Sequence, residues 1–167
     1  RVDERSLYGL IGENMVLKRV LSRVRGVLGL PQPLERAQIL DRTLIVRRGT
    51  IRTTPDYDDA WLFACAQNAQ CIVDVGSNIG QAAVLMLSAG HTDSIVLVEA
   101  NPEALIIASE NVIRNFALLS IHLVCAFAGG SDGETVEFWT VGTGAAGSIN
   151  PEHATIPVPI QKNGLLR

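Results

Sequence analysis

The chain has 167 residues, of which 47% are hydrophobic, so it is long enough for one sizeable core, which means one domain plus an appendage. The net charge of −3 is unevenly spread: residues 1–52 carry eleven Lys or Arg and five Asp or Glu, whereas residues 53–167 carry three and twelve. An acidic body argues against a nucleic acid substrate, because phosphate contacts need Lys and Arg. No apolar stretch approaches the roughly 18 residues of a membrane-spanning helix, which predicts a soluble protein.

The three cysteines, Cys65, Cys71 and Cys125, form no C-x-x-C pair and lie among apolar residues. This pattern indicates neither a disulfide framework nor a zinc site, and no metal site is expected. Buried free thiols in a cytoplasmic protein fit it best, because a buried free Cys behaves as a small hydrophobe.

Residues 14–30 predict a basic amphipathic helix, because apolar residues recur near a 3.6-residue period with Lys and Arg between them. Two readings stay open: a helix packed on the domain with a solvated basic face, or a peripheral anchor on an anionic membrane surface. The chain starts at Arg1 without a Met or a leader, which suggests a piece of a longer chain.

The segment "PQPLERAQ" is expected to be a linker, and "TLIVRRGTIRTT" a short hairpin that turns at Gly49. We therefore divide the chain into an N-terminal helix and linker, 1–42, and a domain, 43–167. Within that domain "PDYDDAWLFACAQNAQ" predicts a helix capped by Asp56 or Asp58, with an apolar stripe that includes Trp61 and Leu62.

From residue 71 onward, short apolar strands alternate with helices. The strands are "CIVDVG", "SIVLVEA" and "SIHLVCAFA"; the helices are "QAAVLMLSAG" and "NPEALIIASENVIRNF", the latter with Asn101 as N-cap and Pro102 at its first position. This alternation predicts an α/β fold of Rossmann-like, three-layer type, with parallel strands buried on both faces. A surface hairpin follows, in which "SDGETVEFWTV" pairs with "TIPVPI".

The turn "VDVGSNIG" joins the first parallel strand to its helix, where ligands of open α/β sheets bind. Gly76 and Gly80 allow a close backbone approach and close packing, and Glu99 ends the next strand, where a carboxylate can accept hydrogen bonds from ribose hydroxyls. A dinucleotide fingerprint has Gly at the position of Asp74. An acid there repels a pyrophosphate and favours a cationic ligand without phosphate, such as S-adenosylmethionine.

These segments, together with "VLVEANPEALIIASENVIRN", "IHLVCAFAGGSDGETVEF" and "GTGAAGSI", resemble the FkbM-type S-adenosylmethionine-dependent methyltransferases over residues 43–160. The resemblance implies that the parallel strands are the 3-2-1 half of the family's sheet. It also implies O-methylation of a hydroxyl on a sugar or natural product. By position, the methionine end of the cofactor is expected at Asp74, Gly76, Ser77, Asn78 and Gly80. Glu99 would bind the ribose, and Ala100 and Ala126 would lie near the adenine.

The family continues into a further strand with a "KIDVEG"-like motif, which this sequence lacks. Strand 71–75 is therefore expected to form an apolar sheet edge, so that the chain is a fragment or is completed by a partner chain. His153 is the one weak candidate for a catalytic base, and no catalytic residue is assigned. Two other functions remain open: an NAD-type nucleotide-binding domain and a non-catalytic interaction module.

Overall fold

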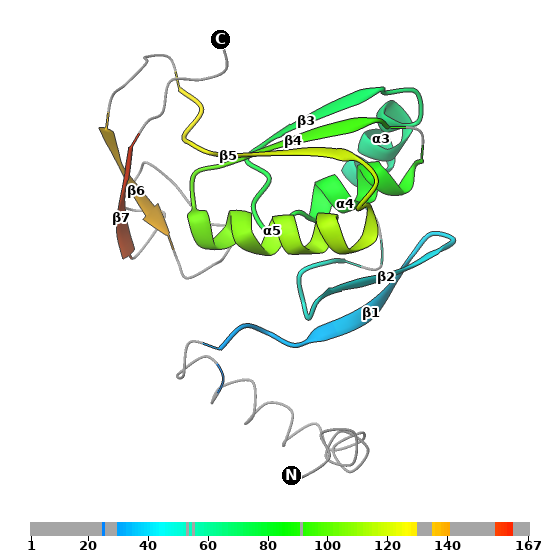
Figure 1. Ribbon diagram of the computed structural model, residues 1–167, viewed down its shortest axis with the longest axis horizontal. Helices are drawn as coiled ribbons and strands as arrows, with labels where there is room; N and C mark the ends of the chain where they lie inside the picture. The colour runs from blue at the N-terminus through cyan, green and yellow to red at the C-terminus, as the bar shows by residue number, and fades with distance from the viewer. Residues whose placement is uncertain are drawn as a thin grey trace. The chain divides into compact units, whose positions relative to one another are not determined.

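The computed structural model describes residues 25, 30–52, 54, 56–90, 92–129, 135–140 and 156–161. The chain divides into two compact units, Arg1–Pro33 and Leu34–Arg167, and the strands that the structure describes belong to the second (Figure 1). Most of the helix expected over 14–30 lies outside the described residues, as does His153. Within the part of the chain that is described, no helix is both long enough and apolar enough to cross a membrane.

The second unit contains a three-stranded parallel sheet in the order β3-β4-β5. Its strands are β3 (Cys71–Val75), β4 (Ser94–Glu99) and β5 (Ser120–Cys125), joined by helices α4 (Gln81–Ser88) and α5 (Pro102–Asn115). Helix α3 (Tyr57–Ala66) precedes the sheet and contacts α4. The α/β, Rossmann-like fold class and the strand order are thereby confirmed.

Helix boundaries follow the capping residues. Asp56 caps α3 by accepting a hydrogen bond from the amide of Asp59, whose own side chain binds back to the amide of Asp56. Asn101 caps α5 by accepting from the amide of Glu103, and Pro102 occupies the first turn. Both caps were predicted from the sequence. Of the two candidates for the cap of α3, Asp56 and Asp58, the structure has Asp56.

The N-terminal hairpin differs from expectation. The supposed linker forms β1 (Leu34–Ile39), which pairs antiparallel with β2 (Arg42–Arg47) through a turn at Leu40 and Asp41 rather than at Gly49. Leu40 has φ 54°, a conformation that Gly or Asn normally supplies, so the sequence carries no turn signal there. Ala37 and Ile39 alternate inward along β1, and their burial against the core makes this segment a strand.

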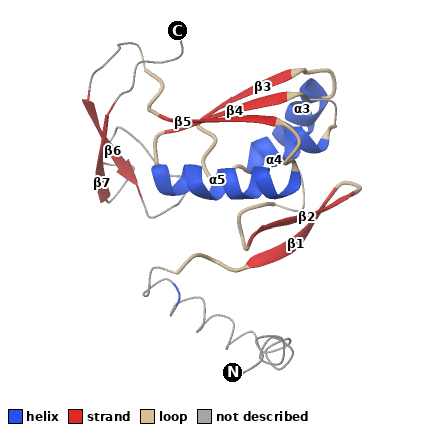
Figure 2. Ribbon diagram, in the orientation of Figure 1, coloured by secondary structure: helices blue, strands red, loops and turns tan. Residues whose placement is uncertain are grey.

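The layers are sheet, helices and hairpin. Figure 2 shows α4 and α5 on one side of the parallel sheet, with the β1–β2 hairpin beyond α5. The core lies between these layers, and its most buried apolar side chains come from all three: Val46, Val84, Ile95, Leu97 and Val112.

Burial on both faces of the sheet is wrong for β3. Val73 and Val75 are 54% and 58% exposed, whereas Ile72, which faces the helices, is 6% exposed. Successive parallel crossovers of one hand place α4 and α5 on the same face, and among the described residues no element covers the other. Strand β3 is also a sheet edge, since β4 is its one partner among the described strands.

Two further expectations of burial are wrong for related reasons. Cys65, Cys71 and Cys125 are all exposed, because they lie on the outer side of α3, on the open face of β3 and on the outermost strand β5. On α3, Trp61 and Leu62 are 60% and 36% exposed, and the helix instead buries Asp59 and Ala66.

The C-terminal hairpin pairs β6 (Thr135–Thr140) antiparallel with β7 (Ile156–Gln161), as the sequence predicts. Its role differs from that of the expected surface strand, however. Phe138 on β6 is only 6% exposed and packs with Ala100 and Phe127, which lie one residue after β4 and two residues after β5.

Candidate functional site

The turn between β3 and α4 is held in an unusual backbone conformation. Gly76, Asn78 and Gly80 have positive φ values of 78°, 49° and 84°. The amides of Gly76 and Ser77 donate to the carbonyl of Val98 at 2.8 and 3.1 Å, which ties the turn to β4. Left-handed conformations cost little for Gly and are tolerated by Asn, so this stretch is suited to the turn.

The two glycines are needed for different reasons. A Cβ on Gly80 would lie 2.9 Å from the Cα of Ala108 on α5, whereas one on Gly76 would meet nothing within 4 Å. At Gly76 the requirement is conformational, but at Gly80 close helix packing is added to it. The absence of a side chain at Gly80 therefore lets the start of α4 lie directly against α5.

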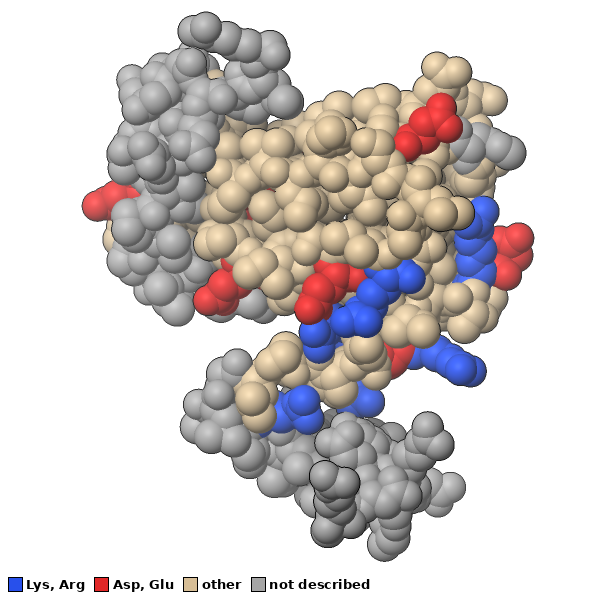
Figure 3. Space-filling model, viewed as in Figure 1, with Lys and Arg blue, Asp and Glu red and all other residues tan. Residues whose placement is uncertain are grey.

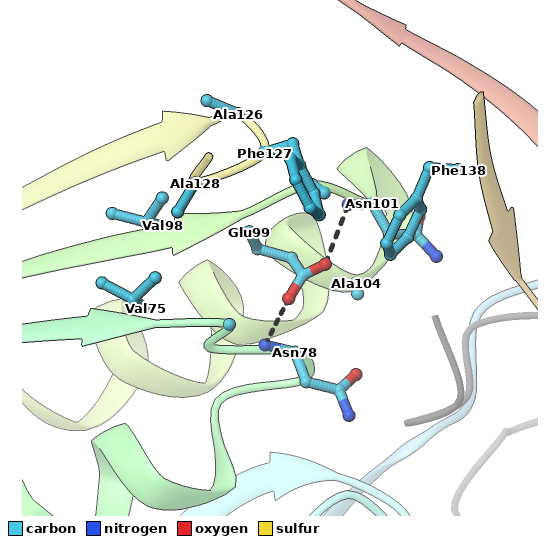
Figure 4. Close-up of a pocket in the computed structure, with 12 residues that line it drawn as sticks. Val75, Asn78, Val98, Glu99, Asn101, Ala104, Ala126, Phe127, Ala128 and Phe138 are labelled. Carbon is cyan, nitrogen blue, oxygen red and sulfur yellow. Dashed lines mark hydrogen bonds between the residues drawn. The ribbon is translucent and has the colours of Figure 1, made fainter. Parts of the chain in front are cut away.

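Glu99 is the anionic group at the centre of the site (Figure 4). Its carboxylate accepts hydrogen bonds from two backbone amides: Asn78 donates to Oε2 at 2.7 Å and Asn101 donates to Oε1 at 2.8 Å. The residue is 7% exposed. Each oxygen keeps a second acceptor position, so the carboxylate is held in place and can still bind two hydroxyl groups of a ligand.

Asp74 lies on β3, one residue before the strand ends at Val75. Burial raises the pKa of its carboxyl group, and the negative charge of Glu99 raises it further. Its buried Oδ2 has no hydrogen-bond partner, and neither does the buried Oγ of Ser77 in the turn. Buried polar atoms are nearly always paired, so these two oxygens are candidates for hydrogen bonds to a ligand.

A pocket of about 310 Å³ opens beside Glu99, within the range of small-molecule sites. At one end it is lined by Gly76, Asn78 and Glu99. At the other end, small and aromatic apolar side chains line it: Ala100, Ala104, Ala126, Phe127, Ala128 and Phe138. We call these the turn end and the aromatic end.

The aromatic end contains two phenyl rings that the sequence did not identify. The rings of Phe127 and Phe138 have their centroids 6.2 Å apart and their planes inclined by 54°. Figure 4 shows both rings beside the carboxylate of Glu99, with Phe138 contributed by β6. The alternation of residues along β6 predicts which side of that strand Phe138 occupies. No local feature of the sequence, however, predicts that β6 packs against the ends of β4 and β5.

Five of the residues predicted from the sequence line the pocket: Gly76, Asn78, Glu99, Ala100 and Ala126. Asp74, Ser77 and Gly80 belong to the same strand and turn but do not form its walls. In the ranges that are described, no group of His, Cys, Asp and Glu is placed to bind a metal ion.

Among the described residues that line the pocket, Glu99 is the one with a charged side chain. Basic and acidic groups meet where the β1–β2 hairpin adjoins α5 (Figure 3), and one such contact is the ion pair between Arg47 and Glu110. This contact holds the pKa of Glu110 low, chiefly through the hydrogen bond from Arg47. Glu99 and Asp74 are accordingly the acidic groups of the site itself.

No protein-family model and no curated protein matches the chain. Among solved structures, it is similar to the SAM dependent methyltransferase from Agrobacterium tumefaciens, with 15% identity and a TM-score of 0.44 over 55% of this chain and 32% of that one. It is also similar to P. horikoshii TYW2 in complex with MeSAdo, with 14% identity and a TM-score of 0.39 over 71% of this chain and 62% of that one. The chain thus spans about a third of the length of the first and less than two thirds of the second.

Proposed function

We propose that the pocket binds S-adenosylmethionine and that the chain is, or belongs to, an S-adenosylmethionine-dependent methyltransferase of the FkbM type. The observation that carries the proposal is Glu99, whose carboxylate is held between the amides of Asn78 and Asn101 with acceptor positions left over. A carboxylate fixed at the end of the second parallel strand suits the two hydroxyls of a ribose.

The charge of the site favours S-adenosylmethionine over a dinucleotide. Asp74 and Glu99 would both lie near an approaching pyrophosphate, and burial together with the charge of Glu99 already raises the pKa of Asp74. A ligand with positive charge relieves that repulsion, whereas a phosphate adds to it. Asp74 and Ser77, whose buried oxygens lack partners, would then lie behind the pocket wall next to the ammonium and sulfonium end of the ligand.

The rest of the ligand fits the two ends of the pocket. A planar base suits the aromatic end, where Phe138 and Phe127 offer ring faces and edges and Ala100 and Ala126 leave room beside them. The ribose would lie against Glu99 and the methionine end along the turn. When bound, the cofactor supplies an electrophilic methyl group, and these residues fix its orientation.

For the acceptor, we propose a hydroxyl oxygen of a sugar or another small molecule. Methyl transfer to oxygen is an in-line displacement that depends mainly on positioning, and a base must take the hydroxyl proton. His153 is the candidate base from the sequence. Further chain, or a partner along the edge strand β3, would complete the acceptor side of the pocket.

Calorimetric titration with S-adenosylhomocysteine and with NAD tests the cofactor assignment. We expect S-adenosylhomocysteine to bind with micromolar affinity and NAD to show no heat of binding, because Asp74 and Glu99 repel its pyrophosphate. Binding of NAD alone would favour the nucleotide-binding alternative. Binding of neither ligand by the folded chain would favour the interaction module.

A further inference from the structure

The side chain of Asn111, in the middle of α5, is fully buried and makes three hydrogen bonds. Its Oδ1 accepts from the amide of Arg47 at 2.8 Å, and its Nδ2 donates to Oγ1 of Thr50 and to the carbonyl of Ile79, each at 3.0 Å. Both donor hydrogens and one acceptor position are thus used. A buried side-chain amide that loses a hydrogen bond lowers the stability of the fold. The three bonds of Asn111 therefore hold their three partners in place relative to one another.

One of these partners belongs to the glycine turn. Ile79 lies between Asn78 and Gly80, the two turn residues with φ values of 49° and 84°. The turn is therefore held from two directions: Glu99 binds the amide of Asn78 from the pocket side, and Asn111 binds the carbonyl of Ile79 from α5.

The other two partners belong to the β1–β2 hairpin and the turn that follows it. Thr50 closes that turn, since its amide and its Oγ1 both donate to the carbonyl of Arg47 at 3.2 and 2.6 Å. Arg47 is anchored to α5 a second time through its ion pair with Glu110. A short chain of hydrogen bonds thus runs from the hairpin through Asn111 to the glycine turn.

We propose that Asn111 is a positioning residue that couples the N-terminal hairpin to the glycine turn. The hairpin then has a role in ligand binding although none of its residues lines the pocket. Since coupling between two sites is reciprocal, a ligand that orders the turn also strengthens the docking of the hairpin. Only the identity of that ligand depends on the proposed function.

Asn115 provides a matched control one helical turn later. Its side chain also pairs with the hairpin, accepting from the amide of Ile45 and donating to the carbonyl of Ile45, both at 2.9 Å. The side chain of Asn115 also donates to the carbonyl of Asn111 at 2.7 Å. Among the described residues, its partners are Ile45 and Asn111, and none belongs to the glycine turn. Loss of Asn115 therefore weakens the same hairpin contact without touching the turn.

The first test needs no ligand. Amide hydrogen exchange of Asn78 and Gly80 is compared in the wild type, Asn111→Ala, Asn115→Ala and Thr50→Val, at temperatures that give each variant the same global stability. We expect Asn111→Ala to lower protection at both amides about tenfold, as the loss of a buried hydrogen bond requires. Asn115→Ala should leave them within about twofold of the wild type, since that bond does not reach the turn.

Thr50→Val keeps the fold and the bond to Ile79 but removes the hydroxyl that fixes Asn111, so a smaller loss of protection is expected. It keeps the inference testable if Asn111→Ala does not fold. Unchanged protection of the turn in both variants, or an equal loss in Asn115→Ala, would overturn the inference.

The second test uses S-adenosylhomocysteine. If it binds the wild type, saturation should slow exchange of the Arg47 amide, and Asn111→Ala should weaken binding about tenfold while Asn115→Ala does not. If the wild type does not bind it, the proposed function fails, and the ligand-free exchange still decides whether Asn111 couples the hairpin to the turn.

Discussion

The two ends of the pocket are built by different means. At the turn end, the shape comes from the backbone, which has a positive φ at three residues. Amides of the turn donate to the carbonyl of Val98 and to the carboxylate of Glu99, and the carbonyl of Ile79 accepts from Asn111. At the aromatic end it comes from side-chain packing, with Phe127 and Phe138 beside small alanines. Backbone geometry has few alternatives, whereas packed apolar side chains can rearrange. Substitutions should therefore have large effects at the turn end and graded effects at the aromatic end.

Gly80→Ala tests the turn end most severely. An alanine at this position must adopt a left-handed backbone conformation, and its Cβ would lie 2.9 Å from the Cα of Ala108. We therefore expect the free energy of unfolding to fall by about 3 kcal/mol. Urea denaturation measures the change through the midpoint. Gly76→Ala is the control, since it shares the positive φ but has open space around it, and about 1 kcal/mol is expected. Equal losses would mean that close packing of α4 on α5 is not what requires Gly80.

Glu99→Ala removes the carboxylate that joins the two ends. We expect affinity for S-adenosylhomocysteine to fall about 10- to 100-fold. In the proposed binding mode both ribose hydroxyls would lose a buried partner, and the amides of Asn78 and Asn101 lose theirs as well. Titration calorimetry well below the unfolding temperature separates this loss from instability. Glu103→Ala, an exposed acid in the first turn of α5, should leave the affinity unchanged. An affinity for the Glu99 variant like that of the wild type would remove Glu99 from the ribose site.

Asp74→Asn tests whether the turn end carries an uncompensated charge. Folding raises the pKa of Asp74 above its unfolded value of about 3.8. The contribution of Asp74 to the free energy of unfolding is therefore fully present below pH 3.8, and it is lost as the pH rises through the folded pKa. The Asn variant should therefore equal the wild type near pH 3.5 and exceed it by about 1 kcal/mol at pH 7 without ligand, as expected when a buried unpaired group is relieved.

The same substitution should weaken binding of S-adenosylmethionine more than that of S-adenosylhomocysteine, because the sulfonium charge is present only in the former. Urea denaturation at the two pH values and paired titrations measure both effects. A variant that is less stable than the wild type at pH 7 would show that Asp74 has a compensating partner in the protein.

The sequence predicted the turn end well because its signals are local. Glycines, an acid at a strand end and the Asn-Pro start of α5 all lie within a few residues of the structure they produce. The parallel pairing of β3, β4 and β5 follows from the strand and helix alternation, and their order from the resemblance to the methyltransferase family.

The two phenyl rings of the aromatic end and the turn position of the N-terminal hairpin could not be predicted in this way. Phe138 is brought to the pocket by packing of a separate hairpin against Ala100 and Phe127, which no local pattern encodes. The hairpin turn at Leu40 lacks the Gly or Asn that such turns normally contain, and Asn111 on α5 and Asn115 satisfy backbone groups of β2 from a distant element. Tertiary contacts decided these features, so a reading of adjacent residues misses them.

Phe138→Leu tests the aromatic end and should have the smallest effect. Leu keeps the apolar contact but removes the ring face, so we expect affinity for S-adenosylhomocysteine to fall about three- to tenfold, equivalent to an aromatic contact of about 0.5–1.5 kcal/mol. Phe138→Ala should weaken binding further, because it also leaves a cavity beside Phe127. Titration calorimetry of the two variants should show affinities that fall in steps from the wild type to Phe138→Leu to Phe138→Ala. If Phe138→Leu lowered the affinity as much as Glu99→Ala, the aromatic end would be as rigidly specified as the turn end. If neither variant changed the affinity, the base would lie elsewhere and the hairpin would serve only to cover Ala100.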